Sequence, residues 1–188
     1  ETQTRKLFEV CRLRDMPITT FINKLDREGQ DPFDLLDEIE QSLALDVCPI
    51  TWPIGMGKHF KGCYNIQDDE LFLFERSKGD TIQAGIQCNG LDDPKLSEHL
   101  EDFELEKLKN DIEMVQGLCK PFDKQAYLEG HMTPVFFGSA INNFGVNDLL
   151  QGIGQHAPCP LDQETTEGRV KAADKKVSAF VFKVQANM

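Results

Sequence analysis

Residues 18–26, Ile-Thr-Thr-Phe-Ile-Asn-Lys-Leu-Asp, constrain the fold more than any other part of the sequence. The run that ends at Ile22 is rich in β-branched and aromatic residues, which predicts a buried strand, and an Asn-Lys-x-Asp tetrad follows at its carboxyl end. In open α/β sheets, ligands bind beyond the carboxyl ends of the strands. We therefore predict an α/β fold in which residues 23–26 form a binding loop.

The tetrad has side chains suited to reading a guanine base. Asp26 only accepts hydrogen bonds, and its two oxygens match the ring N1–H and the exocyclic amine on one guanine edge. Adenine has no such pair of donors. The stem of Lys24 can lie over the base, the Asn23 amide can tie the loop to a neighbouring loop, and Leu25 is expected to turn into the core. A four-residue motif also occurs by chance in ordinary polar strand-to-helix loops, so a second element is needed.

A second apolar strand with a small-residue end lies at residues 133–140, Thr-Pro-Val-Phe-Phe-Gly-Ser-Ala. Small residues let backbone N–H groups approach a ligand closely, and one such N–H could donate to the guanine O6. An Asn-Lys-x-Asp loop followed by a Ser-Ala loop, in that chain order, resembles the fourth and fifth signature elements of translational GTPases. The two loops together favour guanine recognition over coincidence.

The length and charge of the chain limit its size and its partners. Its 188 residues can bury one core, or about one and a half domains. The formal net charge of −12 argues against a direct nucleic-acid grip in this segment, because phosphate binding needs a basic face. The acidity fits ordinary solubility, and a specific basic partner is the alternative.

Cysteine spacing and hydropathy bear on the expected location. The six cysteines are widely spread and include no Cys-x-x-Cys pair, so we expect neither a zinc site nor a redox motif, and we assign no metal ligand. Reduced thiols are expected. No run reaches the roughly 18 apolar residues of a membrane span, and the first six residues lack the apolar core of a signal peptide. We therefore expect a cytoplasmic protein without a membrane partner.

Apolar periodicity and capping residues predict five helices. Two of them start at Asp-Pro pairs, an N-cap followed by proline at the first helical position. The longest has an apolar stripe from Leu96 to Val115 and an acidic opposite face, which is either solvated or a docking surface for a protein. The predicted helices are residues 1–14, 32 to about 45, 94 to about 115, 121–129, and 146 to about 153.

Residues 47–55 are expected to be extended, because two prolines exclude a helix there and suit the edge of a sheet. Three later runs are separated by turn residues and predict a small antiparallel sheet. These runs are residues 62–66, 70–74 and 81–86.

The C-terminal part changes character after Pro158. Residues 162–174 are polar and charged, which is typical of a linker. Residues 175–188 alternate like a strand, with Phe180 and Phe182 on one face, and are expected to begin a further domain.

The sequence Gly-Met-Gly-Lys at residues 55–58 is not expected to bind phosphate. A phosphate-binding loop needs Gly-x-x-x-x-Gly-Lys followed by Ser or Thr, whereas Trp52 occupies the first glycine position and His59 follows the lysine. Turn glycines beside a surface lysine are the favoured interpretation. Phosphates and magnesium provide most of the affinity of a guanine-nucleotide site, so we expect this segment alone neither to bind GTP tightly nor to hydrolyse it.

Taken together, several stretches resemble the bacterial peptide chain release factor 3 family of translational GTPases. Elongation factor G shares the guanine motifs, whereas the Trp of Thr51-Trp52-Pro53 and the closing Phe-Lys-Val-Gln-Ala-Asn-Met are similar to the release factor family. The resemblance runs over the whole chain and is loosest in residues 64–130. The stretches that carry it are residues 1–7, 12–15, 23–27, 49–55, 60–62, 135–140, 143–146 and 180–188.

The resemblance implies a partial P-loop GTPase G domain, a mostly parallel sheet with helices, that carries an inserted α+β subdomain and is followed by the first strand of a β-barrel. It divides the chain into the C-terminal part of the G domain with the guanine-specificity loop (1–59), the inserted subdomain (60–132), the last strand and helix of the G domain (133–158), a linker (159–174) and the start of domain II (175–188).

The resemblance also implies a ribosome-associated GTPase that promotes dissociation of class I release factors after peptide release. Asn23, Lys24 and Asp26, with Leu25 between them, would bind guanine, Ser139 would brace the Asp26 loop, and the Ala140 N–H would meet O6. The cofactors would be GTP or GDP with Mg²⁺. The magnesium ligands and catalytic residues would lie upstream, so none is named here, and the inserted subdomain would face the ribosomal stalk.

Two alternatives remain at this point. The nearer one is another translational GTPase, such as an elongation factor G-like translocase or a ribosome-protection factor. The farther one is a non-enzymatic interaction module, in which the Asn-Lys-x-Asp loop is incidental and the acidic subdomain binds a protein. Base specificity distinguishes the interaction module from the GTPases.

Overall fold

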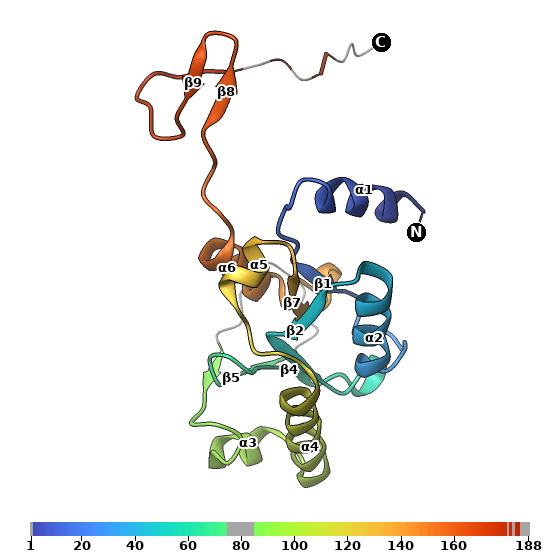
Figure 1. Cartoon of the computed structure of the whole chain (residues 1–188). Coiled ribbons are helices and arrows are strands. Elements are labelled where there is room, and N and C mark those ends of the chain that lie inside the picture. The colour runs from blue at the N-terminus through green and yellow to red at the C-terminus, as the bar shows by residue number, and fades with distance from the viewer. Residues whose placement is uncertain (1, 75–84, 180, 182, 185–188) are drawn as a thin grey trace. The chain divides into compact units, whose positions relative to one another are not determined.

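The computed structural model describes residues 2–74, 85–179, 181, 183 and 184, in two compact units, Glu1–Ala157 and Pro158–Met188 (Figure 1). It has the predicted α/β fold with a parallel sheet and helices. The helices are α1 (Thr2–Arg12), α2 (Pro32–Leu43), α3 (Pro94–His99), α4 (Asp102–Leu118), α5 (Lys124–Leu128) and α6 (Val146–His156), with 3-10 turns at Gly57–His59 and Ala140–Asn142. The strands are β1 (Thr20–Ile22), β2 (Asp46–Pro49), β3 (Thr51–Ile54), β4 (Gly62–Asn65), β5 (Glu70–Leu73), β6 (Ile86–Gln87), β7 (Met132–Phe137), β8 (Gln163–Thr165) and β9 (Gly168–Val170).

The first unit is built on a parallel sheet of order β1-β7-β2. β7 lies in the middle and pairs with both neighbours, with Ile22 of β1 opposite Phe137 at the carboxyl end. All three strands run in the same direction, so the segments that follow β1 and β7 leave the sheet at the same edge. The sheet thereby brings together two loops that are more than a hundred residues apart in the sequence.

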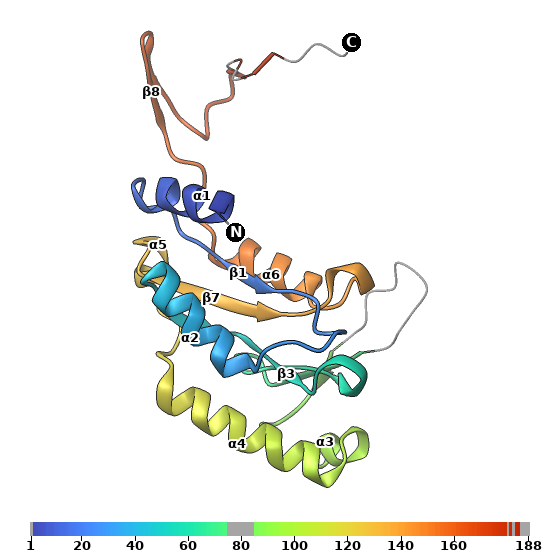
Figure 2. The same ribbon diagram turned by 90° about the vertical axis from the view of Figure 1, so that its right-hand side faces the viewer.

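The two faces of this sheet are covered by different elements. Phe136 points to one face, where it packs with Leu149 of α6, and Phe137 points to the other, where it joins a larger core with Trp52. This opposition follows from the alternation of side chains along a strand. In Figure 2, α6 and α2 lie on opposite sides of β7. The central strand β7 is therefore buried on both faces, which suits its mostly apolar sequence.

A four-stranded antiparallel sheet of order β3-β4-β5-β6 packs beneath the parallel one. The predicted extended segment 47–55 is two strands in different sheets, because Ile50 links β2 to β3. Its N–H donates to the Val135 carbonyl, and its carbonyl accepts from the Ile66 N–H. Of the predicted run 81–86, residues 81–84 lie outside the described residues, and β6 begins at Ile86.

Trp52 is the centre of the shared core. It has no exposed surface, and its ring lies 4.7 Å from Phe33 of α2 and 5.6 Å from Phe137 of β7. Its indole N–H donates to Asp111 of α4 at 3.1 Å. One side chain thus joins α2, the parallel sheet and α4, which covers the outer side of the antiparallel sheet together with α3 (Figure 1).

The helix predictions are confirmed in position, with one difference in α3 and α4. Asp31 and Asp93 accept the N–H groups of Phe33 and Lys95, so both Asp-Pro starts are helix caps. The single long helix predicted after Asp93 is broken at Leu100, which is extended, and α4 restarts with a capping box between Glu101 and Glu104. At the break, the Leu100 N–H donates to Leu96 and the Glu101 N–H donates to Glu104, so the interruption leaves neither N–H unpaired.

The second unit contains a β8–β9 hairpin within the stretch predicted as a linker, and Arg169 pairs with Asp162 across it at 3.1 Å. The strand predicted at 175–188 is absent from the described residues of that stretch. A strand forms by hydrogen bonding to a neighbouring strand, and none of the described strands pairs with residues 175–188. Phe180 and Phe182 lie outside the described residues. Within the described ranges, no helix is long and apolar enough to cross a membrane.

Candidate functional site

The loops that follow β1 and β7 are joined by side-chain hydrogen bonds. The Ser139 hydroxyl donates to Oδ1 of Asp26 at 2.5 Å, and the Ala140 N–H donates to Oδ1 of Asn23 at 2.9 Å. The strand ends also bond directly, from the Gly138 N–H to the carbonyl of Ile22 at 3.0 Å. The structure therefore brings together the two loops that the sequence assigned to one site.

Ser139 is held rigidly within its own turn. It is completely buried, its backbone exchanges two 3.0 Å hydrogen bonds with Phe144, and its hydroxyl accepts from the Asn142 amide at 2.7 Å. Because Asn142 donates to the hydroxyl, the hydroxyl proton is directed to Asp26. Sequence reasoning missed Asn142, and its place three residues after Ser139 in a short turn was the available signal.

Asn23 ties the two loops together, as its amide was expected to do. Its Oδ1 accepts both the Ala140 N–H and the N–H of Lys24, the latter at 2.8 Å. The Ala140 N–H, which sequence reasoning assigned to the guanine O6, is therefore engaged by Asn23 in this structure. For it to meet O6, this hydrogen bond would have to be shared with the base or exchanged for it.

The middle of the Asn-Lys-x-Asp loop is fixed at Leu25. Its side chain is 3% exposed, as expected for a spacer turned into the core. Its N–H donates to the Gly138 carbonyl at 3.2 Å, and its carbonyl accepts from the Gly57 N–H at 2.8 Å. The neighbouring Lys24 has a φ of 73°, a left-handed conformation that is uncommon for a residue with a side chain. Lys24 itself is exposed to solvent, which leaves its stem free to cover a ligand.

Asp26 is the acceptor that this frame presents. It is only partly buried, and one of its oxygens is already oriented by Ser139. A carboxylate has about four acceptor positions, so the Ser139 bond leaves room for two further donors on one edge of a ligand. The arrangement is able to accept two adjacent N–H groups, which is the pattern of a guanine edge.

Internal hydrogen bonds use the N–H of Gly57 in the glycine turn at 55–58 and N–H groups of the residues that follow it. The Gly57 N–H donates to Leu25, the His59 N–H to Met56 at 3.1 Å, and the Lys61 N–H to Ile54 at 2.8 Å. A phosphate-binding loop instead points successive free N–H groups at its ligand. Among the described residues there is also no group of three or more His, Cys, Asp or Glu placed to hold a metal ion.

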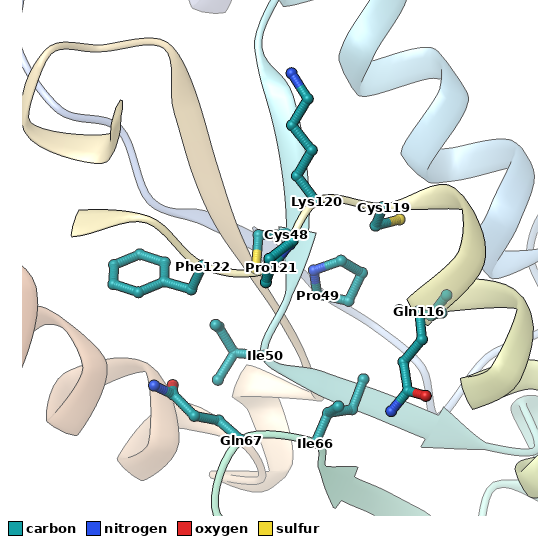
Figure 3. A pocket seen from close by; sticks show the side chains of 11 residues that line it. Cys48, Pro49, Ile50, Ile66, Gln67, Gln116, Cys119, Lys120, Pro121 and Phe122 are labelled. Atoms are coloured by element: carbon teal, nitrogen blue, oxygen red, sulfur yellow. The ribbon is translucent and has the colours of Figure 1, made fainter. Parts of the chain in front are cut away.

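A cavity of about 480 Å³ lies elsewhere in the unit, between β2, the end of α4 and the segment that follows it (Figure 3). Its lining is mostly apolar and includes Ile50, Ile66 and Phe122, with two cysteines. Burial raises the pKa of Cys48 to about 12 and that of Cys119 to about 11, so neither thiol is a thiolate at neutral pH. The cavity shares no lining residue with the Asn-Lys-x-Asp loop.

A parallel sheet whose strand ends carry these two loops has the arrangement of a GTP-binding domain. The chain belongs to the family of the elongation factor Tu GTP binding domain, whose model matches residues 1–159. It is therefore a member of the translational GTPase family, whose domains bind guanine nucleotides with Mg²⁺.

Solved structures show the same fold. A crystal structure of a protein from Thermus thermophilus superposes with a TM-score of 0.55 at 20% sequence identity. The match covers 88% of this chain and 28% of that chain. The chain thus spans little more than a quarter of the protein it resembles in structure, and this likeness concerns the fold alone.

Proposed function

We propose that this chain reads the guanine base in a GTPase that acts on the ribosome. The observation that carries the proposal is the Asp26 carboxylate, oriented by buried Ser139 at the carboxyl edge of a parallel sheet. Ligands of open α/β sheets bind at this edge. In the bound state, Asp26 accepts the N1–H and the exocyclic amine of guanine, and Ser139 keeps its carboxylate in the plane of the base.

The other residues of the loops support this reading of the base. Asn23 holds the two loops in register, Lys24 lays its stem over the base, and buried Leu25 fixes the height of the loop above the sheet. Ala140 shares its N–H between Oδ1 of Asn23 and O6 once the base has entered. These roles use the groups that the two loops already place side by side.

The described residues include groups suited to bind the base of the nucleotide, and no loop among them has the sequence of a phosphate-binding loop. The Asp26 loop offers acceptors for guanine, whereas the glycine turn at 55–58 lacks the sequence of a phosphate loop and its Gly57 N–H already donates to Leu25. When bound, Mg²⁺ supplies charge neutralisation at the phosphates. We place its ligands and the catalytic residues outside this chain, so that the chain contributes base selectivity and no phosphate chemistry.

For the whole protein, we infer the role of a termination factor that promotes dissociation of class I release factors after peptide release. The resemblance to the release factor 3 family supports this role, above all through Thr51-Trp52-Pro53. Trp52 is fully buried and bonded to Asp111, so the residue that distinguishes this family from elongation factor G also fixes α4. The ribosome, including its stalk, is the proposed partner, and an elongation factor G-like translocase or a ribosome-protection factor is the alternative.

Base exchange tests the guanine site directly. In the full-length protein, Asp26→Asn replaces a carboxylate acceptor with an amide that can donate to the C2 carbonyl of xanthine. GDP affinity should fall about 30- to 150-fold, the equivalent of about 2 to 3 kcal/mol, and affinity for xanthosine diphosphate should rise. Unchanged GDP binding in a folded Asp26→Asn variant contradicts the assignment.

A kinetic measurement tests the termination role. A labelled class I release factor is bound to a post-termination ribosome, and its departure is followed with and without the full-length protein and GTP. Acceleration that requires GTP supports the proposed role. No acceleration, with translocation stimulated instead, assigns the protein to the elongation factor branch and leaves the guanine site unaffected.

A further inference from the structure

The turn between β3 and β4 contacts both loops of the guanine site. The Gly57 N–H donates to the Leu25 carbonyl at 2.8 Å, and the Gly29 N–H lies 3.1 Å from the sulfur of Met56. Three residues after Gly57, the ring of Phe60 meets the ring of Phe144 edge-on at 5.4 Å. The turn therefore reaches the Asn-Lys-x-Asp loop with its backbone and the Ser-Ala loop with an aromatic side chain.

The contact with Leu25 favours glycine at position 57. Gly57 has a φ of +62°, and a Cβ built there would lie 2.1 Å from Oε1 of Glu28. An L residue at this position would strain the backbone, and it would push aside the exposed side chain of Glu28, two residues after Asp26. The bond to Leu25 would shift with the turn, because it is made by the backbone N–H of the same residue.

The contact with Phe144 acts on Ser139. Phe144 is the residue that exchanges two backbone hydrogen bonds with Ser139, and Ser139 orients Asp26. Phe60 is 5% exposed and also packs against Phe74 of the antiparallel sheet at 5.0 Å between ring centroids. The antiparallel sheet and the turn that follows β3 thus contact both supports of the Asp26 carboxylate, one through Leu25 and one through Phe144.

We propose that Gly57 and Phe60 are positioning residues for guanine recognition, through which the antiparallel sheet holds the Asp26 carboxylate in the plane of the base. The inference rests on the proposed guanine site and adds a support that neither loop contains. Its consequence is specific: distortion of the turn weakens the reading of the base edge and leaves binding of the phosphates unchanged.

The ratio of affinities for GDP and inosine diphosphate measures the alignment of Asp26. Inosine lacks the exocyclic amine, so inosine diphosphate keeps the phosphates and N1–H and loses one of the two donors to the carboxylate. A misaligned carboxylate gains less from that second donor. The ratio of the two dissociation constants therefore falls when Asp26 is misplaced, and it does not change when only the phosphate site or the general stability is affected.

The test uses isothermal titration calorimetry on the full-length protein with GDP and inosine diphosphate. Gly57→Ala should lower GDP affinity about fivefold and inosine diphosphate affinity less than about twofold, given the cost of a left-handed alanine. Gly90→Ala is the matched control, because Gly90 also has a left-handed φ, +80°, and a Cβ there would meet nothing within 4 Å. Its affinities for both nucleotides should match the wild type.

A second variant covers the case in which Gly57→Ala does not fold. Phe60→Leu keeps an apolar side chain in the core and removes the edge-on contact with Phe144, so it should lower the same ratio. An unchanged ratio in a folded Gly57→Ala protein, or in Phe60→Leu if the first variant is unfolded, overturns the inference. An equal fall in Gly90→Ala also overturns it. Failure of the proposed guanine site looks different, since the wild-type protein itself would then not distinguish the two nucleotides.

Discussion

The Ser139 hydroxyl donates to Oδ1 of Asp26 across 113 residues of sequence, and Ser139 has no exposed surface. A buried donor beside a partly exposed carboxylate fixes the direction of that carboxylate without competing water. The Asn142 amide donates to the hydroxyl oxygen of Ser139, so the hydroxyl proton is free to donate to Asp26. Asp26 is thus oriented before any ligand arrives, which lowers the entropy cost of binding a base edge.

Ser139→Ala should therefore weaken guanine binding, although in the proposed site Ser139 acts on the base only through Asp26. Loss of one hydrogen bond to a charged group costs about 1.5 to 3 kcal/mol, so GDP affinity should fall roughly 10- to 150-fold. Equilibrium titration with GDP measures the effect. Ser97→Ala, at an exposed position of α3, is the control and should bind GDP as the wild type does. Equal GDP affinities of Ser139→Ala and Ser97→Ala would show that Ser139 does not orient Asp26.

The parts of the fold that could be predicted are those governed by local chemistry. Asp31 and Asp93 cap helices because their side chains reach the N–H groups two residues on, which is visible in any Asp-Pro pair before an apolar stripe. The two loops met because strands that end in polar or small residues share one edge of a parallel sheet. The caps depend on local spacing, and the meeting of the loops could be predicted because each of the two strand ends carries its own motif.

The parts that could not be predicted depend on partners distant in sequence. The change of sheet at Ile50 is set by Val135 and Ile66, and no local pattern specifies it. The break at Leu100 follows from a capping box that an uninterrupted apolar stripe conceals. The contact of Gly57 with Leu25 joins a turn and a loop whose proximity only the packed core determines.

The left-handed backbone of Lys24 predicts different stabilities for two small replacements. Both Lys24→Gly and Lys24→Ala remove the stem and should lower GDP affinity. Because Lys24 has a φ of 73°, glycine relieves backbone strain and alanine retains it, so the Gly variant should be the more stable by about 1 to 2 kcal/mol. Urea denaturation of the two variants gives the difference. A Gly variant less stable than the Ala variant would mean that residue 24 leaves this conformation in solution.

Asp148 on α6 predicts a pH dependence of stability. Burial raises the pKa of Asp148, a backbone hydrogen bond lowers it, and the nearby carboxylates Glu70 and Asp68 raise it, which together bring the pKa to about 6. The folded-state pKa lies above the ordinary value of about 4. The contribution of Asp148 to the free energy of unfolding is therefore fully present below pH 4 and is lost as the pH rises through about 6.

Asp148→Asn should remove this loss of stability. At pH 8 the variant should be more stable than the wild type by about 1 to 3 kcal/mol, and the difference should shrink toward pH 4. Urea denaturation between pH 4 and pH 8 measures it. Glu38→Gln, which removes one exposed carboxylate from α2, is the charge-matched control and should follow the wild-type profile. Parallel profiles for wild type and Asp148→Asn would contradict the prediction.

Trp52 and Asp111 predict a measurable coupling between the core and α4. The indole N–H donates to the Asp111 carboxylate at 3.1 Å, so Asp111→Ala and Trp52→Phe each remove the same bond. Asp111→Ala should cost about 1.5 to 3 kcal/mol, whereas Trp52→Phe should cost more because it also leaves space among Phe33 and Phe137. The double variant should cost less than the sum of the two, by about 1 kcal/mol or more, when stability is measured by urea denaturation followed by circular dichroism.

Trp52 is the only tryptophan, so its fluorescence in Asp111→Ala reports the same core independently. Strict additivity would mean that the bond contributes nothing to the attachment of α4, and Trp52 would then act through packing alone.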